Sequence, residues 1–573
     1  MPPRKACDIC FKRKIQCSIP SPGVPCDWCS NQEIPCTFTR PPQKRKHATT
    51  PDAVCVLSRR VEQLEAELAR RNAEGQLASP ESDATRTEES VASQTDFSAQ
   101  EVSESESGVP SSLQLGRSWY FRGMQLLSKK GQQWIESKTG QTAPLKEYVA
   151  FDGVKVHTAS SQENRGPART LPDKQATNAI IDAFFKHSVH PVLDHTLIYA
   201  TVEEAYSLPK SLPAQACVWA LHTWSDSPST KAQTYEAEAV VQCRSLLERM
   251  GWEPSLEALQ AILLLVYRRL YFNMQDGLLH AAACQMACDL RNTLSPDSKD
   301  LGMVRKRRHL EVIFGLCYTL DKDIALRSGQ PPRLTEDYCD LAFITESDYP
   351  ELRLSLVKER TCRLLYSQKA AKLSDGEILQ YIRQLDDELE QWRLSVPMSI
   401  RPRLSTPDSA GGMDRQLIQL QLDYHCTLIS IHTMVRRCGA SNKELPEDLH
   451  SVVHSSVDLS LEAGRSTLMF LKSTLSSLGE QAFRHIQWYS PVAAMALFVD
   501  ILVHPLGDSA QADLDTMKQS AGVFQNIPAS SLFHVETQQM QTLSGFIMEL
   551  VRLASCAIWK ARQANMGWQH DTK

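Results

Sequence analysis

The sequence lacks any unbroken apolar run long enough to cross a membrane. Its longest strongly apolar stretch, VAAMALFVDILV from Val492, is about a dozen residues long and contains Asp500. Because a membrane-spanning helix needs roughly 20 apolar residues, this stretch predicts a buried core helix. The N-terminal MPPRKACD has no apolar core behind its charges and does not resemble a secretory signal. We therefore expect a soluble, intracellular protein with no membrane partner.

The sequence also lacks the common signatures of catalysis. It contains no G-x-G-x-x-G, G-x4-G-K-[ST], H-E-x-x-H or G-x-S-x-G pattern. His187 and His190 in FFKHSVHP could form a dyad, but beside an aromatic helix we interpret them as structural. Strand-like alternation of polar and apolar residues is scarce. These absences favour a mostly α-helical protein that is not an enzyme.

Net charge is small, at −5, but this total hides two segments of opposite sign. Residues 1–46 hold nine Lys or Arg against three acids, whereas residues 75–113 hold one Arg against eight acids. The basic segment suggests a polyanion partner at that end of the chain. The acidic segment contains a single aromatic residue and much Ser, so it cannot bury a core. We expect a disordered spacer over 75–115, with acidic activation as the alternative.

Cysteine is concentrated near the N-terminus. Six of the 17 cysteines lie in CDICFKRKIQC and CDWCSNQEIPC, two copies of C-D-x-C-x6-C, and in a reducing compartment this pattern favours metal over disulfides. Zinc takes four ligands, so each three-cysteine half is one short, but two zinc ions reach four if two thiolates bridge. Asp8 and Asp27 can each cap a short helix. The candidate zinc ligands are Cys7, Cys10, Cys17, Cys26, Cys29 and Cys36.

The other cysteines are scattered through the chain. Cys284 and Cys288 are spaced i, i+4 on an apolar helical stretch and could share a metal. Because we find no His or acid at ligand spacing, we interpret them as buried core thiols.

The N-terminal pattern resembles that of the fungal binuclear zinc-cluster transcription factors, in which two C-x2-C-x6-C halves are joined by a short loop, usually with Pro. The loop here is SIPSPGVP. In that family the first and fourth cysteines bridge, which gives this role to Cys7 and Cys26 and implies two zinc ions per chain. The resemblance also implies a nuclear factor that binds CGG-type triplets in double-stranded DNA and engages the transcription machinery. A zinc scaffold that binds protein or RNA is the alternative.

Only the first half of the repeat is basic. By the resemblance its helix enters the major groove, where Lys14 aligns with the family's base-contacting Lys and Arg13 stands beside it. Lys12 is interpreted as a phosphate contact. The family commonly has cations where this chain has Phe11 and Gln16, so we expect weaker affinity for the DNA backbone. The remaining DNA-binding candidates, which also suit a nuclear import signal, are Arg40, Lys44, Arg45 and Lys46.

A short coiled coil is predicted after the basic linker. With the first seam residue at heptad position a, a parallel partner would set Arg60 against Glu65 of the other chain. Two heptads are marginal alone, and the family's use of such a coil for dimerisation favours a homodimer. Packing on its own chain is the alternative. The seam residues are Val54, Leu57, Val61, Leu64 and Leu68.

From about Asp173 the sequence takes on helical periodicity. Ser255–Leu290 predicts two helices joined near Asn273–Gly277, and the domain, at roughly 390 residues, is large enough for two packed lobes. FFKHSVHPVLD and RKRRHLEVIFGLCYTLDKDIALRSGQPPRL resemble the family's central regulatory domain, where a small-molecule effector is conceivable. We interpret the basic run Arg305–Arg308 as a solvated helix face. Further helices are expected over Leu417–Val435, Ser455–Leu475 and Thr537–Ala561.

The sequence thus predicts a mostly α fold in six parts. These are a zinc module with two short helices (1–40), a basic linker (41–53), the coil (54–74), the acidic linker (75–115), a partly ordered connection (116–172) and an all-helical regulatory domain (173–565). The expected function is a dimeric transcription factor of RNA polymerase II genes on paired CGG-type triplets. Its expected targets are a metabolic gene cluster, such as one for a secondary metabolite, with nutrient catabolism genes as the alternative.

Overall fold

The computed structural model divides the chain into two compact units, Met1–Ser103 and Glu104–Lys573. In the first unit it describes residues 7, 17, 25–26, 29–30 and 36–37. In the second it describes residues 119–145, 170–188, 191–207, 209–224, 230–269, 277–293, 300–328, 331–337, 339, 349–404, 413–439, 447–478, 482–524, 527 and 534–571.

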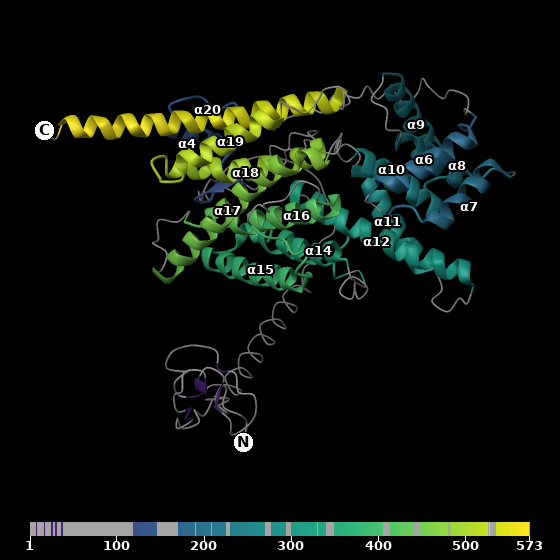
Figure 1. Ribbon diagram of the computed structural model, residues 1–573, viewed down its shortest axis with the longest axis horizontal. Helices are drawn as coiled ribbons and strands as arrows, with labels where there is room; N and C mark the ends of the chain where they lie inside the picture. The colour runs from purple at the N-terminus through teal and green to yellow at the C-terminus, as the bar shows by residue number, and fades with distance from the viewer. Residues whose placement is uncertain are drawn as a thin grey trace, which may run out of the picture. The chain divides into compact units, whose positions relative to one another are not determined.

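The second unit is built almost entirely of helices, which confirms the predicted fold class (Figure 1). Its described strands, β1 (Tyr120–Phe121) and β2 (Met124–Gln125), form one small antiparallel hairpin. The first group of helices comprises α4 (Lys129–Thr139), α6 (Lys174–His187), α7 (His195–Tyr206), α8 (Leu212–Leu221), α9 (Thr230–Arg249), α10 (Leu256–Arg269), α11 (Gly277–Thr293) and α12 (Leu301–Ser328). The second comprises α14 (Pro350–Thr361), α15 (Asp375–Ser395), α16 (Arg415–His432), α17 (Glu447–Leu478), α18 (Ala482–Val503), α19 (Ala510–Phe524) and α20 (His534–Asp571).

Helix starts coincide with side chains that can cap them. Asp173, where the sequence turns helical, is the N-cap of α6 and accepts hydrogen bonds from the backbone N–H groups of Gln175 and Ala176. Asp194 caps α7 in the same way. The first N–H groups of a helix have no partner within it, so a carboxylate at this position satisfies them and fixes where the helix begins.

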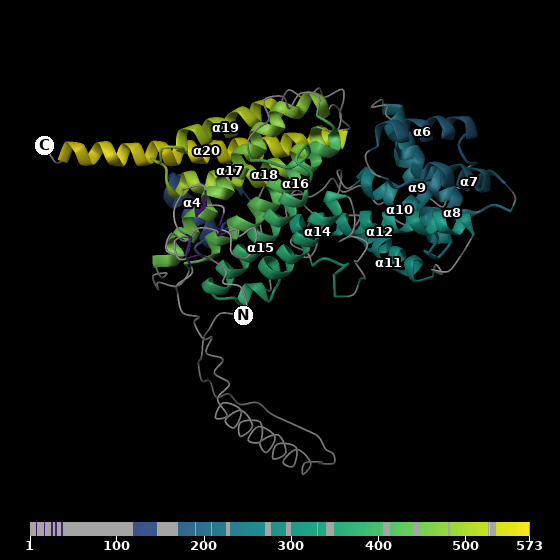
Figure 2. The same cartoon turned by 60° about the horizontal axis from the view of Figure 1, so that its bottom comes forward.

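The second unit contains two large hydrophobic clusters, formed by different helices. Helices α6–α12 surround one cluster, and α14–α20 with α4 surround the other. Helix α18 lies within the second cluster and packs against α16, α17, α19 and α20 (Figure 2). Its stretch His485–Val503 has the length and hydropathy of a membrane span but is 94% buried inside the protein. The apolar stretch from Val492 is therefore part of a core helix, as predicted.

Residues 119–145 contribute to the second cluster. Trp119, Leu126 and Ile135 are buried there, and the Trp119 ring stacks on Phe546 of α20 with centroids 5.9 Å apart. The α4 helix contacts both α18 and α20. This part of the expected connecting segment therefore packs with the helical domain.

The two clusters meet where α12 packs against α14. Asp321 and Lys322 of α12 and Glu359 of α14 are all buried at this junction. The carboxylate of Asp321 accepts hydrogen bonds from the backbone N–H groups of Arg333 and Leu334. A buried carboxylate that satisfies two backbone donors gives a physical reason for an Asp at position 321.

Candidate metal centre

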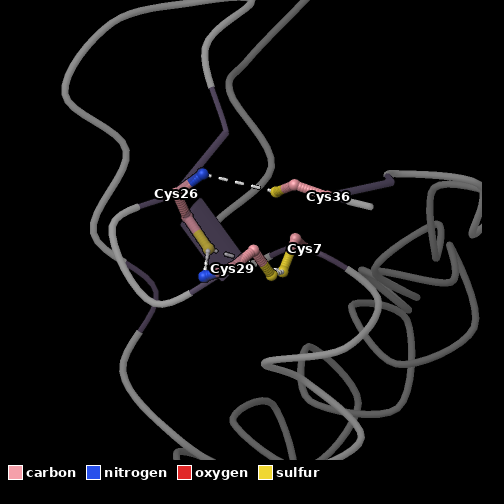
Figure 3. A group of neighbouring side chains, drawn as sticks. All are labelled: Cys7, Cys26, Cys29 and Cys36. Carbon is pink, nitrogen blue, oxygen red and sulfur yellow. Dashed lines mark hydrogen bonds between the residues drawn. The ribbon is translucent and has the colours of Figure 1, made fainter. Parts of the chain in front are cut away.

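Four cysteine sulfurs gather in the first unit. The side chains of Cys7, Cys26, Cys29 and Cys36 point toward one another (Figure 3). Cys7, Cys26 and Cys29 are fully buried, and Cys36 is half-buried. The Sγ atom of Cys7 lies 3.8 Å from that of Cys26 and 3.6 Å from that of Cys29. The cluster therefore draws one thiol from the first half of the repeat and three from the second.

These sulfur separations suit a tetrahedral metal site. With Zn–S bonds of about 2.3 Å, a regular tetrahedron places its sulfurs about 3.8 Å apart. A disulfide would need about 2.05 Å, much less than either separation between Cys7 and its neighbours. The four thiols are therefore spaced as ligands of one ion.

Each half of the repeat contains the same internal hydrogen bond from a backbone N–H to a cysteine sulfur. The N–H of Cys7 donates to the Sγ of Cys17 at 3.3 Å, and the N–H of Cys26 donates to the Sγ of Cys36 at 3.4 Å. Each bond joins the first cysteine of a half to the third, ten residues later. Donors directed at sulfur favour the thiolate form that a metal requires. The first and third cysteines are thus paired in the same way in both halves.

The surroundings of the Cys29 thiol disfavour its ionisation in the absence of a cation. Burial, together with hydrogen bonds to the neighbouring thiols of Cys26, Cys7 and Cys36, raises the pKa of Cys29 to about 12. A bound divalent cation reverses this, because coordination deprotonates a thiol outright. The donor set fits a thiophilic cation.

The structure describes only some of the predicted site residues. Among the predicted zinc ligands, Cys17 lies beside Cys7, and the four cluster cysteines come together. The remaining candidates fall outside the described residues: Cys10, Lys12, Arg13, Lys14, Arg40, Lys44, Arg45, Lys46, Val54, Leu57, Val61, Leu64 and Leu68.

The basic run at the start of α12 forms ion pairs on the helix surface. Arg305 Nε lies 2.9 Å from Asp194 Oδ1, and Arg307 Nε lies 3.6 Å from Glu311 Oε1. The side chains of both arginines are close to half exposed. This arrangement agrees with a solvated helix face.

The structure confirms that Cys284 is buried but contradicts the premise that it has no His or acid partner. The Nε2 atom of His280 lies 3.3 Å from the Sγ of Cys284, so this thiol has a histidine partner. Asp321, from α12, completes a group of three buried ligand-type side chains. His280 stands four residues before Cys284, a spacing that can be read from the sequence. Asp321, in contrast, reaches this thiol only through the packing of α12 on α11.

The sequence is similar to those of fungal transcription regulators. It is 25% identical over 503 residues to the ABC-transporter-regulating transcription factor of Aspergillus oryzae and 25% identical over 505 residues to the protein of that name in Aspergillus fumigatus. Each match covers 77% of this chain and 54% of the relative. An uncharacterized transcriptional regulatory protein of Schizosaccharomyces pombe is 21% identical over 351 residues, which are 56% of this chain and 51% of that protein.

The chain spans about half the length of the curated relatives it matches. No family model matches the sequence, and no solved structure matches it.

Proposed function

We propose that this relative of fungal transcription regulators is a sequence-specific DNA-binding transcription factor whose cysteine cluster holds two zinc ions. The observation that carries the proposal is the composition of the sulfur group. It contains all three cysteines of the second half, Cys26, Cys29 and Cys36, and Cys7 alone from the first half. If Cys7 and Cys26 bridge, this is the ligand set that one of two zinc ions requires. The other ion would then take Cys7, Cys10, Cys17 and Cys26.

Zinc in such a module is structural. Its binding free energy becomes folding free energy, on the order of 10 kcal/mol or more for small zinc modules. Bridging thiolates would join the two halves, so that the basic first half is held rigidly by the second. Rigidity matters because base readout requires donors at fixed positions in the major groove.

The proposed DNA target is a pair of CGG-type triplets, bound by a homodimer in the nucleus. The basic charge of residues 1–46 supplies phosphate contacts. Lys14, next to Arg13, is proposed to donate to the O6 and N7 acceptors of guanine. The apolar seam from Val54 to Leu68 is proposed to pair two chains in parallel and so to set the spacing of the triplets.

The relatives' names bear on the choice of target genes. Two Aspergillus relatives are named as regulators of ABC transporters. Their similarity over 77% of this chain favours transporter genes as targets. A metabolic gene cluster, such as one for a secondary metabolite, is the competing proposal, because members of the resembled family usually regulate the genes of one metabolic pathway.

Zinc counting in cysteine variants tests the bridging arrangement. Cys26→Ser removes a ligand from both proposed ions and should lose both from the first unit. Cys36→Ser removes a ligand from only one and should retain more zinc. Mass spectrometry of the metal content of the intact chain measures this difference. Equal zinc loss in the two variants would contradict the bridging role of Cys26.

DNA binding tests the reading role of the first half. In fluorescence anisotropy with duplexes that carry paired CGG triplets, Lys14→Ala should weaken binding by roughly 1–3 kcal/mol, about 5- to 150-fold. Cys26→Ser should abolish specific binding. Lys472→Ala, which changes an exposed lysine on α17, is the matched control and should bind normally. A wild-type chain that binds scrambled triplets equally well would exclude the proposed specificity.

A further inference from the structure

A second group of ligand-type side chains lies inside the helical domain, far along the chain from the cysteine cluster. His280 and Cys284 stand one turn apart on α11, and Asp321 comes from the adjacent α12. Their exposed fractions are 4%, 3% and 2%. The ligand atoms all lie within 4.8 Å of one another. The group thus combines an imidazole, a thiol and a carboxylate in the interior.

The separations in this group suit one small cation. The Nε2 atom of His280 lies 3.3 Å from Cys284 Sγ and 3.7 Å from Asp321 Oδ1. For zinc with bonds of about 2.0–2.1 Å to N and O and about 2.3 Å to S, a tetrahedral N–S edge is about 3.6 Å and an N–O edge about 3.3 Å. Each separation is therefore within about 0.4 Å of the edge that a bound ion would set. Ordinary hydrogen bonding does not account for the longer separation, since 3.7 Å exceeds the usual N–H···O range.

The two oxygens of Asp321 have different neighbours. Oδ2 accepts from the ammonium of Lys322 at 2.9 Å and from the backbone N–H of Leu334 at 2.9 Å. Oδ1 is the atom that faces His280. The N–H of Arg333 is shared by both oxygens, at 2.9 Å from Oδ2 and 3.1 Å from Oδ1. A carboxylate oxygen has two lone-pair directions. Oδ1 can therefore keep its amide bond while it binds a cation.

Buried charge at this junction does not cancel. The carboxylates of Asp321 and Glu359 both face the ammonium of Lys322, and the Arg333 side chain is exposed. The other buried ammonium described nearby, that of Lys358, pairs with Asp323 and Asp423. A divalent cation that takes Cys284 as a thiolate would add one positive charge. The formal charges of Asp321, Glu359, Lys322, the metal ion and the Cys284 thiolate would then sum to zero. This neutrality lowers the free-energy cost of burying these groups.

Another thiol stands beside the group. Cys317 lies one turn before Asp321 on α12 and is fully buried. Its Sγ is 4.0 Å from the carbonyl oxygen of Ala283, the residue before Cys284. Two i, i+4 pairs, His280 with Cys284 and Cys317 with Asp321, therefore face each other across α11 and α12.

We propose that His280, Cys284 and Asp321 form a second metal site for a thiophilic divalent cation of the zinc class. Cys317 stands near the site, but its sulfur is not among the mutually close ligand atoms. The ion would join α11 to α12 and, through Asp321, to the turn that carries Arg333 and Leu334. It would stabilise the regulatory domain where its two hydrophobic clusters meet.

The test separates this site from the N-terminal one by changing all six N-terminal cysteines to Ser in the full-length chain. This cluster-minus chain should retain about one zinc after dialysis, as measured by metal mass spectrometry. Added Zn²⁺ should raise the melting temperature of the metal-stripped chain in a concentration-dependent way. Cobalt in its place should show a sulfur-to-metal charge-transfer band.

Variants of the cluster-minus chain identify the ligands. His280→Gln and Cys284→Ala should each lower zinc content several-fold and remove the Zn²⁺-dependent shift in melting temperature, and Cys284→Ala should also remove the charge-transfer band. Cys217→Ala, which changes a fully buried thiol of α8, is the matched control and should keep the ion. A folded cluster-minus chain that binds no zinc, and is not stabilised by it, would overturn the proposal whatever the ligand variants show. Retention of zinc by both ligand variants would overturn it equally.

Discussion

Replacement of Lys322 by Met tests the buried charges at the α12–α14 junction. The Lys322 side chain is fully buried, and its Nζ lies 2.9 Å from Asp321 Oδ2 and 3.9 Å from Glu359 Oε2. It also lies 3.9 Å from the centroid of the Tyr318 ring and donates to the carbonyl oxygen of Leu334. Lys322→Met keeps a similar apolar stem but leaves two buried carboxylates without their ammonium.

The expected cost follows from the loss of one partner in a buried ion pair. Such a loss typically destabilises a protein by about 3–5 kcal/mol, because the remaining charge stays buried and uncompensated. The lost cation–π contact adds to this cost, and burial of the Met thioether returns part of it. We therefore expect Lys322→Met to lower the free energy of unfolding by about 3–5 kcal/mol.

A second substitution distinguishes charge from packing. Glu359 accepts hydrogen bonds from the hydroxyl of Tyr318 and the backbone N–H of Glu336. Glu359→Gln removes one of the two negative charges and keeps one acceptor oxygen for the Glu336 N–H. Its amide N–H can donate to the Tyr318 hydroxyl, which can rotate to accept. In the Lys322→Met background Glu359→Gln should therefore recover about 1–2 kcal/mol, a coupling of the size that double-mutant cycles find for contacting residues.

Urea unfolding of the intact chain, followed by circular dichroism, measures both effects. Lys518→Met is the control, because Lys518 is exposed and, among the described residues, forms an ion pair with the half-exposed Asp515 three positions before it. Its cost should stay below about 0.5 kcal/mol. If Lys322→Met costs less than about 1 kcal/mol, or if Glu359→Gln destabilises the variant further, the charge argument is refuted.

Three further substitutions probe the helical domain. Burial lowers the pKa of His425 to about 4, so as pH falls below about 6.5 the unfolded chain takes up a proton before the folded one, and stability falls. In urea titrations between pH 7 and 5, His425→Gln should make this loss of stability about 2 kcal/mol smaller than in the wild type, and an unchanged pH dependence would contradict the prediction. Arg465 forms a bidentate ion pair with the buried Asp513, with N–O distances of 2.6 and 2.9 Å. Arg465→Met should lower the free energy of unfolding by about 3 kcal/mol in urea, and adding Asp513→Leu should restore most of that stability rather than reduce it further. A Cβ on Gly131 would clash with the carbonyl oxygen of Gln125, so Gly131→Ala should cost about 1–3 kcal/mol and lower the melting temperature, whereas an unchanged melting temperature would mean that α4 can shift freely.

Local physical chemistry made much of this protein predictable from sequence. Helix α6 begins after Asp173, where the sequence predicts helical periodicity to start, because the carboxylate there caps its first turn. The two helices predicted within Ser255–Leu290 are α10, which ends at Arg269, and α11, which begins at Gly277. The paired cysteine frames predicted a metal site because chelation by C-x2-C depends on neighbours in the chain. Each of these predictions needs interactions over only a few residues.

Tertiary packing decided what the sequence left open. The spacing alone does not say which thiol of the first half joins those of the second, and the structure places Cys7 there. His280 and Asp321 are 41 positions apart in the sequence, and they meet because α11 packs against α12. Trp119 reaches Phe546 by the same kind of long-range packing. Such contacts depend on how whole helix surfaces fit together, which periodicity within one helix does not encode.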